Sequence, residues 1–315
     1  MARRPTNKAV KSLLGTIDEA LALLGDLPVA GTGVVPVQES GGSLLDQCLA
    51  LCDEGEARGP EPVRTLHHFA CTGGSLFAKC ASAMPNVRLL SEVDPLSTTQ
   101  QTFREGRLRF SPTDMINLVQ QGDRGADDAL VLDMFLADLA LIHADGERRG
   151  LRLLLRDHAH GHYATGPATP DRPGLRDIVS RRFPVLSLVT VRHPLDSYLS
   201  LRANGWVHFK PGTLDEYGAR YLDFLDAHAG VPVLRYEDLL AEPVRVVRQL
   251  CGYLDLPYNP EFENLFDAVR VTGDSGRAGP VLSPRPRREV TDDLRDESGA
   301  SPNYTRLLQV LGYGD

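Results

Sequence analysis

The sequence predicts an α/β fold with a doubly wound parallel sheet, and two patterns support this prediction. From about residue 63 onward, short apolar runs alternate with longer amphipathic stretches. The runs at 151–156 and 184–191 are dominated by apolar residues and closed by arginine, as expected of strands buried on both faces. Strands that alternate with helices need crossover connections, which build a parallel sheet with helices on both sides.

The elements follow one another in a regular order. Strands are predicted at 63–70, 87–93, 151–156, 184–191 and 231–236. Helices are predicted at 76–84, 112–121 (capped by Ser111 or Thr113), 127–149, from about 195, 213–228 and 244–254. Ligands bind beyond the carboxyl ends of parallel strands. The site is therefore expected to gather Thr72–Ser75, Glu92, Arg156–His158, Arg192 and Tyr236.

The chain is predicted to consist of a helical N-terminal extension, 1–60, and one α/β domain, 61–315. Amphipathic patterns indicate helices at 8–26 and 43–56, with a stretch rich in proline and glycine between them. The extension contains no recognisable chemistry. Its helices are expected to serve packing or homo-oligomerisation.

Composition and charge argue against several classes of function and location. The formal net charge is −8, which argues against nucleic acid as the main partner. The five cysteines are scattered without zinc-finger spacing, so a reduced, cytoplasmic setting is expected. No apolar run is long enough to span a membrane. Asp18 and Glu19 interrupt the N-terminal stretch, so a secretory signal is not expected.

The turn after the first strand reads Cys71-Thr72-Gly73-Gly74-Ser75 and leads into a helix. A strand, a glycine-rich turn and a helix N-terminus together form a common cradle for phosphate. The alternative is a turn that needs glycine only for its backbone geometry. A magnesium-dependent P-loop would also need a lysine directly after its last glycine and an acidic strand end. Instead, two strands end at Arg156 and Arg192, which indicates an anion bound by cations without magnesium.

Arg192 is followed eight residues later by Ser200, in the segment VRHPLDSYLSLR. Here the sequence resembles the cytosolic and bacterial sulfotransferases that use 3′-phosphoadenosine 5′-phosphosulfate (PAPS) and have a P-loop-like fold. The resemblance covers about residues 63–288, with LLLRDH, RYEDLLAEP and VTGDSGRAG following in the family's order. It implies that Arg192 and Ser200 bind the 3′-phosphate of PAPS. It also implies nucleotide-binding roles, without a metal, for Thr72, Gly73, Gly74, Ser75, Tyr236, Gly276 and Arg277.

One position departs from the family. Cys71 stands where the family usually has a lysine or arginine that contacts the phosphosulfate. Lys79, one turn into the helix, or Arg156 would then have to supply the missing charge. Cys71 also favours the alternative of a non-catalytic protein that keeps the nucleotide pocket.

The resemblance also implies catalytic roles. His158 is the expected base that removes the acceptor's proton, and Glu92 is the competing candidate. Arg156 would stabilise the bridging oxygen of the leaving group. Each residue has a plain structural alternative. For His158 it is a hydrogen bond at a strand end, for Glu92 a salt bridge or a helix cap, and for Arg156 an ion pair with Asp157 or Glu92.

Other histidines and arginines allow further readings. His158, His160 and His162 alternate and would share a face in an extended chain, but a metal site there is not favoured because no carboxylate has matching spacing. His67 and His68 lie on opposite faces of a strand, so one is expected to be buried and the other to reach the pocket. The basic run Arg285, Arg287 and Arg288 is interpreted as a solvated loop rather than a phosphate clamp.

The function predicted from the sequence is that of a bacterial-type sulfotransferase. Such an enzyme transfers a sulfuryl group from PAPS to a hydroxyl or amine of a small-molecule, lipid or carbohydrate acceptor. The alternatives are a nucleotide-dependent kinase with a degenerate P-loop and a non-catalytic nucleotide-binding or assembly protein.

Overall fold

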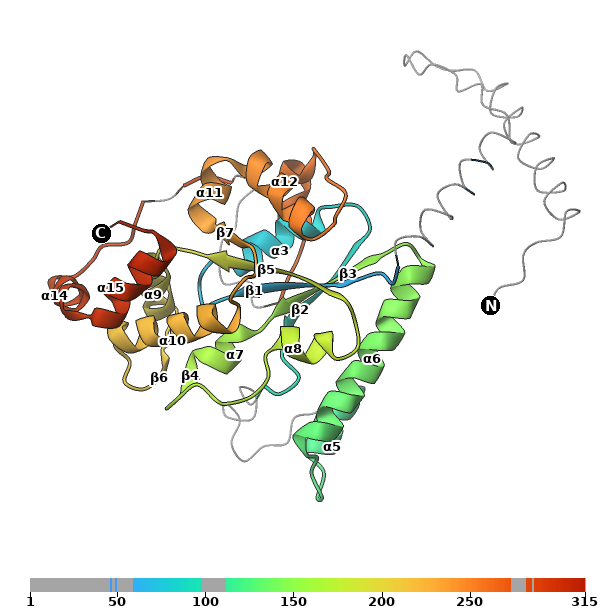
Figure 1. Ribbon diagram of the computed structural model, residues 1–315. Coiled ribbons are helices and arrows are strands. Elements are labelled where there is room, and N and C mark those ends of the chain that lie inside the picture. Colours follow the sequence, from blue (N-terminus) through green and yellow to red (C-terminus); the bar gives the residue numbers. More distant parts are fainter. Residues whose placement is uncertain are drawn as a thin grey trace, which may run out of the picture. The chain divides into compact units, whose positions relative to one another are not determined.

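The computed structural model describes residues 46, 49, 59–97, 112–272, 282–284 and 286–314 (Figure 1). The chain divides into two compact units, Met1–Glu61 and Pro62–Asp315. Every helix and strand named below belongs to the second unit. The helices predicted at 8–26 and 43–56 lie outside the described residues, apart from Asp46 and Leu49.

A five-stranded parallel sheet forms the centre of the second unit, in the order β2-β3-β1-β5-β7. Its strands are β1 (Val63–His68), β2 (Val87–Val93), β3 (Arg152–Asp157), β5 (Val185–Val191) and β7 (Val233–Arg235). All five strands were predicted from their apolar runs, and the parallel α/β fold class is confirmed. A separate two-stranded sheet, β4 (Thr165–Gly166) with β6 (His208–Phe209), was not predicted.

Helices cover both faces of the sheet (Figure 1). Helices α3 (Gly74–Ser82), α11 (Tyr236–Ala241) and α12 (Pro243–Tyr253) pack on one face. The other face carries α6 (Asp128–Arg148), α7 (Ala159–Tyr163), α8 (Leu175–Ser180), α9 (Pro194–Ala203), α10 (Leu214–Ala227) and α15 (Pro302–Leu311). The remaining helices are α5 (Met115–Gln120), α13 (Phe262–Leu265), the short 3₁₀ helix η1 (Phe266–Ala268) and α14 (Asp292–Ala300).

Strands β3 and β5 are rich in apolar residues because successive side chains enter two different cores. On β3, Leu154 packs beneath α3 and α12, whereas Leu153 and Leu155 pack against α6 and α8. On β5, Leu188 and Val189 are divided between the two faces in the same way. Both faces of the inner strands β1 and β3 are therefore buried, as expected of a parallel sheet between two helical layers, whereas the edge strands β2 and β7 are partly exposed.

Some elements differ from the predictions. α5 begins later than expected, and Asp114, rather than Ser111 or Thr113, caps it by accepting from the amide of Asn117 at 3.0 Å. The short helices α7, α8, α11, α13 and α14 and the C-terminal α15 were not predicted, because most span too few residues to show a periodic pattern. Among the described residues, none of the helices is both long and apolar enough to cross a bilayer.

The strand order locates the crevice where a ligand is expected. β1 and β5 are neighbours, but the chain leaves β1 towards β2 on one side and leaves β5 towards β7 on the other. Such a reversal opens a crevice beyond the carboxyl ends of the two adjacent strands. The segments that enter this crevice are the turn after His68 and the start of α9 after Val191.

Candidate active site

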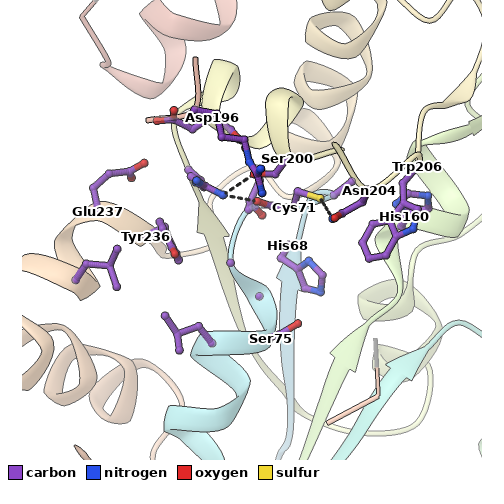
Figure 2. A pocket seen from close by; sticks show the side chains of 18 of the residues that line it. His68, Cys71, Ser75, His160, Asp196, Ser200, Asn204, Trp206, Tyr236 and Glu237 are labelled. Carbon is purple, nitrogen blue, oxygen red and sulfur yellow. Dashed lines mark hydrogen bonds between the residues drawn. The ribbon is translucent and has the colours of Figure 1, made fainter. Parts of the chain in front are cut away.

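A pocket of about 920 Å³ lies at this position and is lined by residues from all five strand ends. Figure 2 shows Tyr236 and Glu237 on one side of it and Trp206 and His160 on the other, with His68 and Ser75 between them. The sequence-predicted residues that line it are Thr72, Gly73, Gly74, Ser75, Lys79, Glu92, Arg156, His158, Arg192, Ser200 and Tyr236. Gly276 and Arg277 lie outside the described residues.

The turn between β1 and α3 requires both of its glycines. Gly73 has φ 91°, and a Cβ built on it would stand 2.3 Å from the ring of Tyr236. A Cβ on Gly74 would stand 2.1 Å from the ring of His68. Cys71 also adopts a positive φ, 62°, in the same turn. The turn therefore packs its backbone directly against two rings, which leaves no room for larger residues.

The N-terminus of α3 opens into the pocket without a capping side chain. Gly73 is its N-cap residue, and the first turn contains no acidic residue. The hydroxyl of Thr72 does not cap the helix, because it donates to the carbonyl oxygen of Phe69 at 2.8 Å. An uncapped helix N-terminus presents backbone N–H groups and partial positive charge to an anion.

The second basic element of the pocket is Arg192, directly after β5. Its Nη1 donates to the Ser200 hydroxyl and to the carbonyl oxygen of Cys71, both at 3.3 Å (Figure 2). The guanidinium also lies over the ring of Tyr236, 4.8 Å from its centroid. Ser200 donates to the carbonyl oxygen of Asp196 at 2.9 Å and so stays on the pocket side of α9. Arg192 and Ser200 thus form one donor cluster.

A segment near the C-terminus, which contains Arg287, contacts helix α9. Arg287 pairs with Asp196 through two bonds, at 2.8 and 3.3 Å, and both residues line the pocket together with Arg288. Arg287 and Arg288 are exposed, as the interpretation of a solvated loop expects, and they also lie at the rim of the pocket. Arg285 lies outside the described residues.

Arg156, near the end of β3, is buried and held by four acceptors. Nε donates to Nε2 of His68 at 3.0 Å, and Nη1 donates to the Ser91 hydroxyl and the Thr272 carbonyl oxygen, both at 2.8 Å. Nη2 pairs with the carboxylate of Glu92 at 2.6 Å. The guanidinium is fixed in orientation, and the paired carboxylate offsets its charge.

A bulge in β2 brings Glu92 into the pocket. The pairing with β3 runs in register up to Ser91 and shifts before Val93, so Glu92 is the extra residue, with φ 62°. One of its carboxylate oxygens contacts Arg156, and the other lies 3.5 Å from Nε2 of His158. Glu92 therefore bridges the two other candidate catalytic residues.

The tautomer of His68 follows from its partners. Its Nε2 accepts the hydrogen bond from Arg156, so the proton is on Nδ1, which lies 3.1 Å from the carbonyl oxygen of Phe69. Burial, followed by the charge of Arg156, holds the pKa of His68 well below its usual value of 6.5. His68 is a neutral support for Arg156 that was not assigned this role from the sequence.

The remaining wall of the pocket is aromatic and weakly charged. The ring of His160 stacks with that of His158 and makes edge contacts with Trp206 and His208. Burial lowers the pKa of His160 to about 4, so its ring is neutral at pH 7. Burial raises the pKa of the Cys71 thiol to about 11, so this position carries no charge either. Trp206 and His208 had no motif that would have identified them.

Two predicted groupings do not form. His162 does not share a face with His158 and His160, because 159–163 are helical and its ring approaches the carbonyl oxygen of Pro170. Asp157 lies between Arg156 and His158 in sequence but faces the interior, where it contacts His67. Of the two adjacent histidines, His67 is fully buried and His68 lines the pocket.

Comparisons with known proteins find several solved structures that are similar to this chain. No family model and no curated protein matches the chain. The sulfotransferase domain from the curacin biosynthetic pathway is 17% identical with a TM-score of 0.47, over 81% of this chain and 98% of that one. The sulfotransferase domain of the Synechococcus PCC 7002 olefin synthase gives 17% and 0.47, over 81% and 96%. A sulfotransferase from Alicyclobacillus acidocaldarius gives 19% and 0.43, over 81% and 97%. All three are sulfotransferases, the family that the sequence motifs resemble.

Proposed function

We propose that the protein is a PAPS-dependent sulfotransferase. The observation that carries this proposal is the presence of two different anion-binding elements in one pocket. The uncapped N-terminus of α3 is one, and the pair Arg192 and Ser200 is the other. They come from different strands, β1 and β5.

Two separate anion sites fit a nucleotide with phosphate on both sides of its ribose. PAPS has a phosphosulfate at the 5′ position and a phosphate at the 3′ position, whereas the phosphates of ATP form a single chain. The α3 N-terminus would bind the phosphosulfate through backbone N–H groups. Arg192, with its planar fork of donors, and Ser200 would bind the 3′-phosphate.

The transfer itself would depend on positioning and charge stabilisation. The acceptor oxygen or nitrogen attacks the sulfur, the bond from sulfur to the bridging oxygen breaks, and 3′,5′-adenosine bisphosphate leaves. Arg156 is fixed beside the turn by four acceptors and is the group that would stabilise the negative charge on the leaving oxygen. Lys79, also in the pocket wall, would add positive charge that Cys71 does not supply.

His158 would take the acceptor's proton. Its Nε2 faces the Glu92 carboxylate at 3.5 Å, so Nε2 is the nitrogen that carries a proton and Nδ1 is left as the base. A carboxylate in this place orients an imidazole and stabilises the imidazolium that forms. Glu92 would therefore support His158, rather than act as the base. The wall formed by His160, Trp206 and His208 would contact the acceptor, a small molecule with a hydroxyl or amine.

A thermal shift experiment tests the proposal. Ligands that bind only the native state raise the apparent stability. We expect 3′,5′-adenosine bisphosphate to raise Tm in the presence of EDTA, and ATP with or without magnesium to have a much smaller effect. A larger shift with magnesium–ATP would instead identify a kinase-like protein. A shift with the bisphosphate but no consumption of PAPS, across a panel of hydroxyl and amine acceptors, would identify a non-catalytic binder.

A further inference from the structure

A second cluster of polar side chains lies on the opposite side of the end of β3 from the pocket. It consists of His67 on β1, Asp157 on β3 and His228, which follows α10. All three are buried, with relative exposures of 0%, 6% and 6%. Each offers one atom that can bind a metal, and these three atoms lie within 4.8 Å of one another. None of the three residues lines the pocket.

The hydrogen bond of His228 decides which of its two nitrogens can bind a metal. Its Nδ1 lies 2.7 Å from the carbonyl oxygen of Phe224, which can only accept, so Nδ1 carries the proton. With its one proton on Nδ1, the neutral ring has a lone pair on Nε2. Within the described part of the chain, no hydrogen-bond donor contacts this Nε2.

His67 has a similar arrangement around it. Its Nδ1 lies 2.7 Å from Oδ2 of Asp157, and its Nε2 lies 2.9 Å from the hydroxyl of Thr65. Thr65 is in turn 2.8 Å from the hydroxyl of Ser187, and either hydroxyl can be the donor. The Thr65 hydroxyl can therefore accept a hydrogen bond from Nε2–H of His67, which leaves Nδ1 available as a ligand.

We propose that Nδ1 of His67, Oδ2 of Asp157 and Nε2 of His228 bind one divalent transition-metal ion, with zinc the expected metal. Two imidazoles and a carboxylate are ligands that zinc prefers. Metal-binding histidines characteristically donate their other N–H to a carbonyl, carboxylate or similar acceptor, as His228 does here and as the Thr65 hydroxyl allows His67 to do. On a tetrahedral zinc with bonds of about 2.0–2.2 Å the ligand atoms are about 3.3 Å apart, so side-chain shifts of about 1 Å would suffice.

The charges around the cluster are compatible with a cation. Asp157 contributes one negative charge, and Arg176 and Asp177 act on His67 with opposite signs. Asp94, which also acts on Asp157, is already paired with Arg172 at 2.7 Å. Binding would break the contact between His67 and Asp157 and release the proton between them, as metal binding to protonated ligands does.

The buried position indicates a structural rather than a catalytic ion. It would connect β1, β3 and the end of α10, which are distant in sequence. It would also fix the end of β3, where Arg156 and the following residue His158 line the pocket. This site is independent of the sulfuryl transfer proposed above, and none of the measurements below depends on nucleotide binding.

Elemental analysis of untagged, full-length protein purified without chelators tests the proposal. We expect roughly one zinc per chain, lost after treatment with a strong chelator together with a fall in Tm. Titration of the chelated protein with Co²⁺ should then give the visible d–d bands of a tetrahedral site. Thr65→Val should keep the fold but weaken zinc binding by about 10- to 100-fold, because it removes the partner of a ligating ring.

The ligand variants and a matched control complete the test. His228→Gln should lose the zinc, whereas His143→Gln, at a buried histidine on α6 outside the cluster, should keep it. The proposal is overturned if wild-type protein from zinc-supplemented cultures contains no transition metal and gives no Co²⁺ bands. It is also overturned if folded His228→Gln retains as much metal as the control.

Discussion

Replacement of Arg192 gives the sharpest test of the nucleotide site, because the structure predicts different losses for two closely related ligands. The guanidinium contacts Ser200 and the Cys71 carbonyl and lies over Tyr236. In the proposed complex it makes charge-assisted bonds to a 3′-phosphate. Such bonds contribute about 1.5–3 kcal/mol. Arg192→Gln should therefore raise the Kd of 3′,5′-adenosine bisphosphate by about 10- to 150-fold.

Adenosine 5′-monophosphate lacks the 3′-phosphate, so its Kd should change little in the same variant. Arg192→Lys keeps the charge but loses the planar fork, and an intermediate loss for the bisphosphate is expected. Titration calorimetry in EDTA measures all of these constants. Arg202→Gln is the matched control, since Arg202 is an exposed arginine on α9, the helix that carries Ser200, and lies outside the pocket.

The result that would refute this reasoning is an equal loss for both nucleotides. It would mean that Arg192 acts through the fold of the turn and Tyr236 rather than through the 3′-phosphate. Unchanged binding of the bisphosphate would also remove Arg192 from the nucleotide site.

Three further predictions concern catalysis, packing and pH. His158→Ala should lower turnover of PAPS by about 10²–10⁴-fold with little change in nucleotide Kd, and the assignment of the base is wrong if only Glu92→Gln abolishes activity. Gly74→Ala should lower the free energy of unfolding, measured by urea denaturation, by about 1–3 kcal/mol, because the added Cβ would overlap the imidazole of His68. The control Gly252→Ala has open space around the added Cβ and should be neutral or slightly stabilising. The pKa of His160 is lowered to about 4, so the stability it contributes is complete above the unfolded value of about 6.5 and is lost as the pH falls towards 4. Between pH 7 and 5 the free energy of unfolding of the wild type should fall by about 1–2 kcal/mol more than that of His160→Gln. The lower end of this range is expected because the ring is partly exposed. If both proteins lose the same free energy of unfolding, this histidine does not titrate as described.

The sheet and the position of the pocket could be predicted from the sequence because they depend on local patterns. The apolar runs before Cys71 and Arg192 identify strands, and the rule that ligands bind at strand ends brings these residues together without knowledge of contacts. The glycines of the turn could likewise be identified as necessary, although not the rings of His68 and Tyr236 that exclude a side chain from them.

The partners of the site residues could not be predicted, because they depend on local irregularities and on distant segments. The approach of Glu92 to Arg156 and His158 depends on a bulge, and a single extra residue in a strand has no periodic signal. His228 lies 161 residues after His67, and nothing in either neighbourhood indicates that they meet. The hydroxyl of Thr72 suited a phosphate contact but donates to a backbone carbonyl instead.

The alternation of Arg156, Asp157 and His158 at the end of β3 has a consequence for how this strand tolerates mutation. Successive residues here belong to two different sites. Arg156 and, just after the strand, His158 line the pocket, whereas Asp157 lies beside the buried His67 and His228. A slip of one residue in strand register exchanges the two faces. A single-residue insertion or deletion within β3 would therefore place a carboxylate in the pocket and an arginine beside His67, and both sites would be lost together.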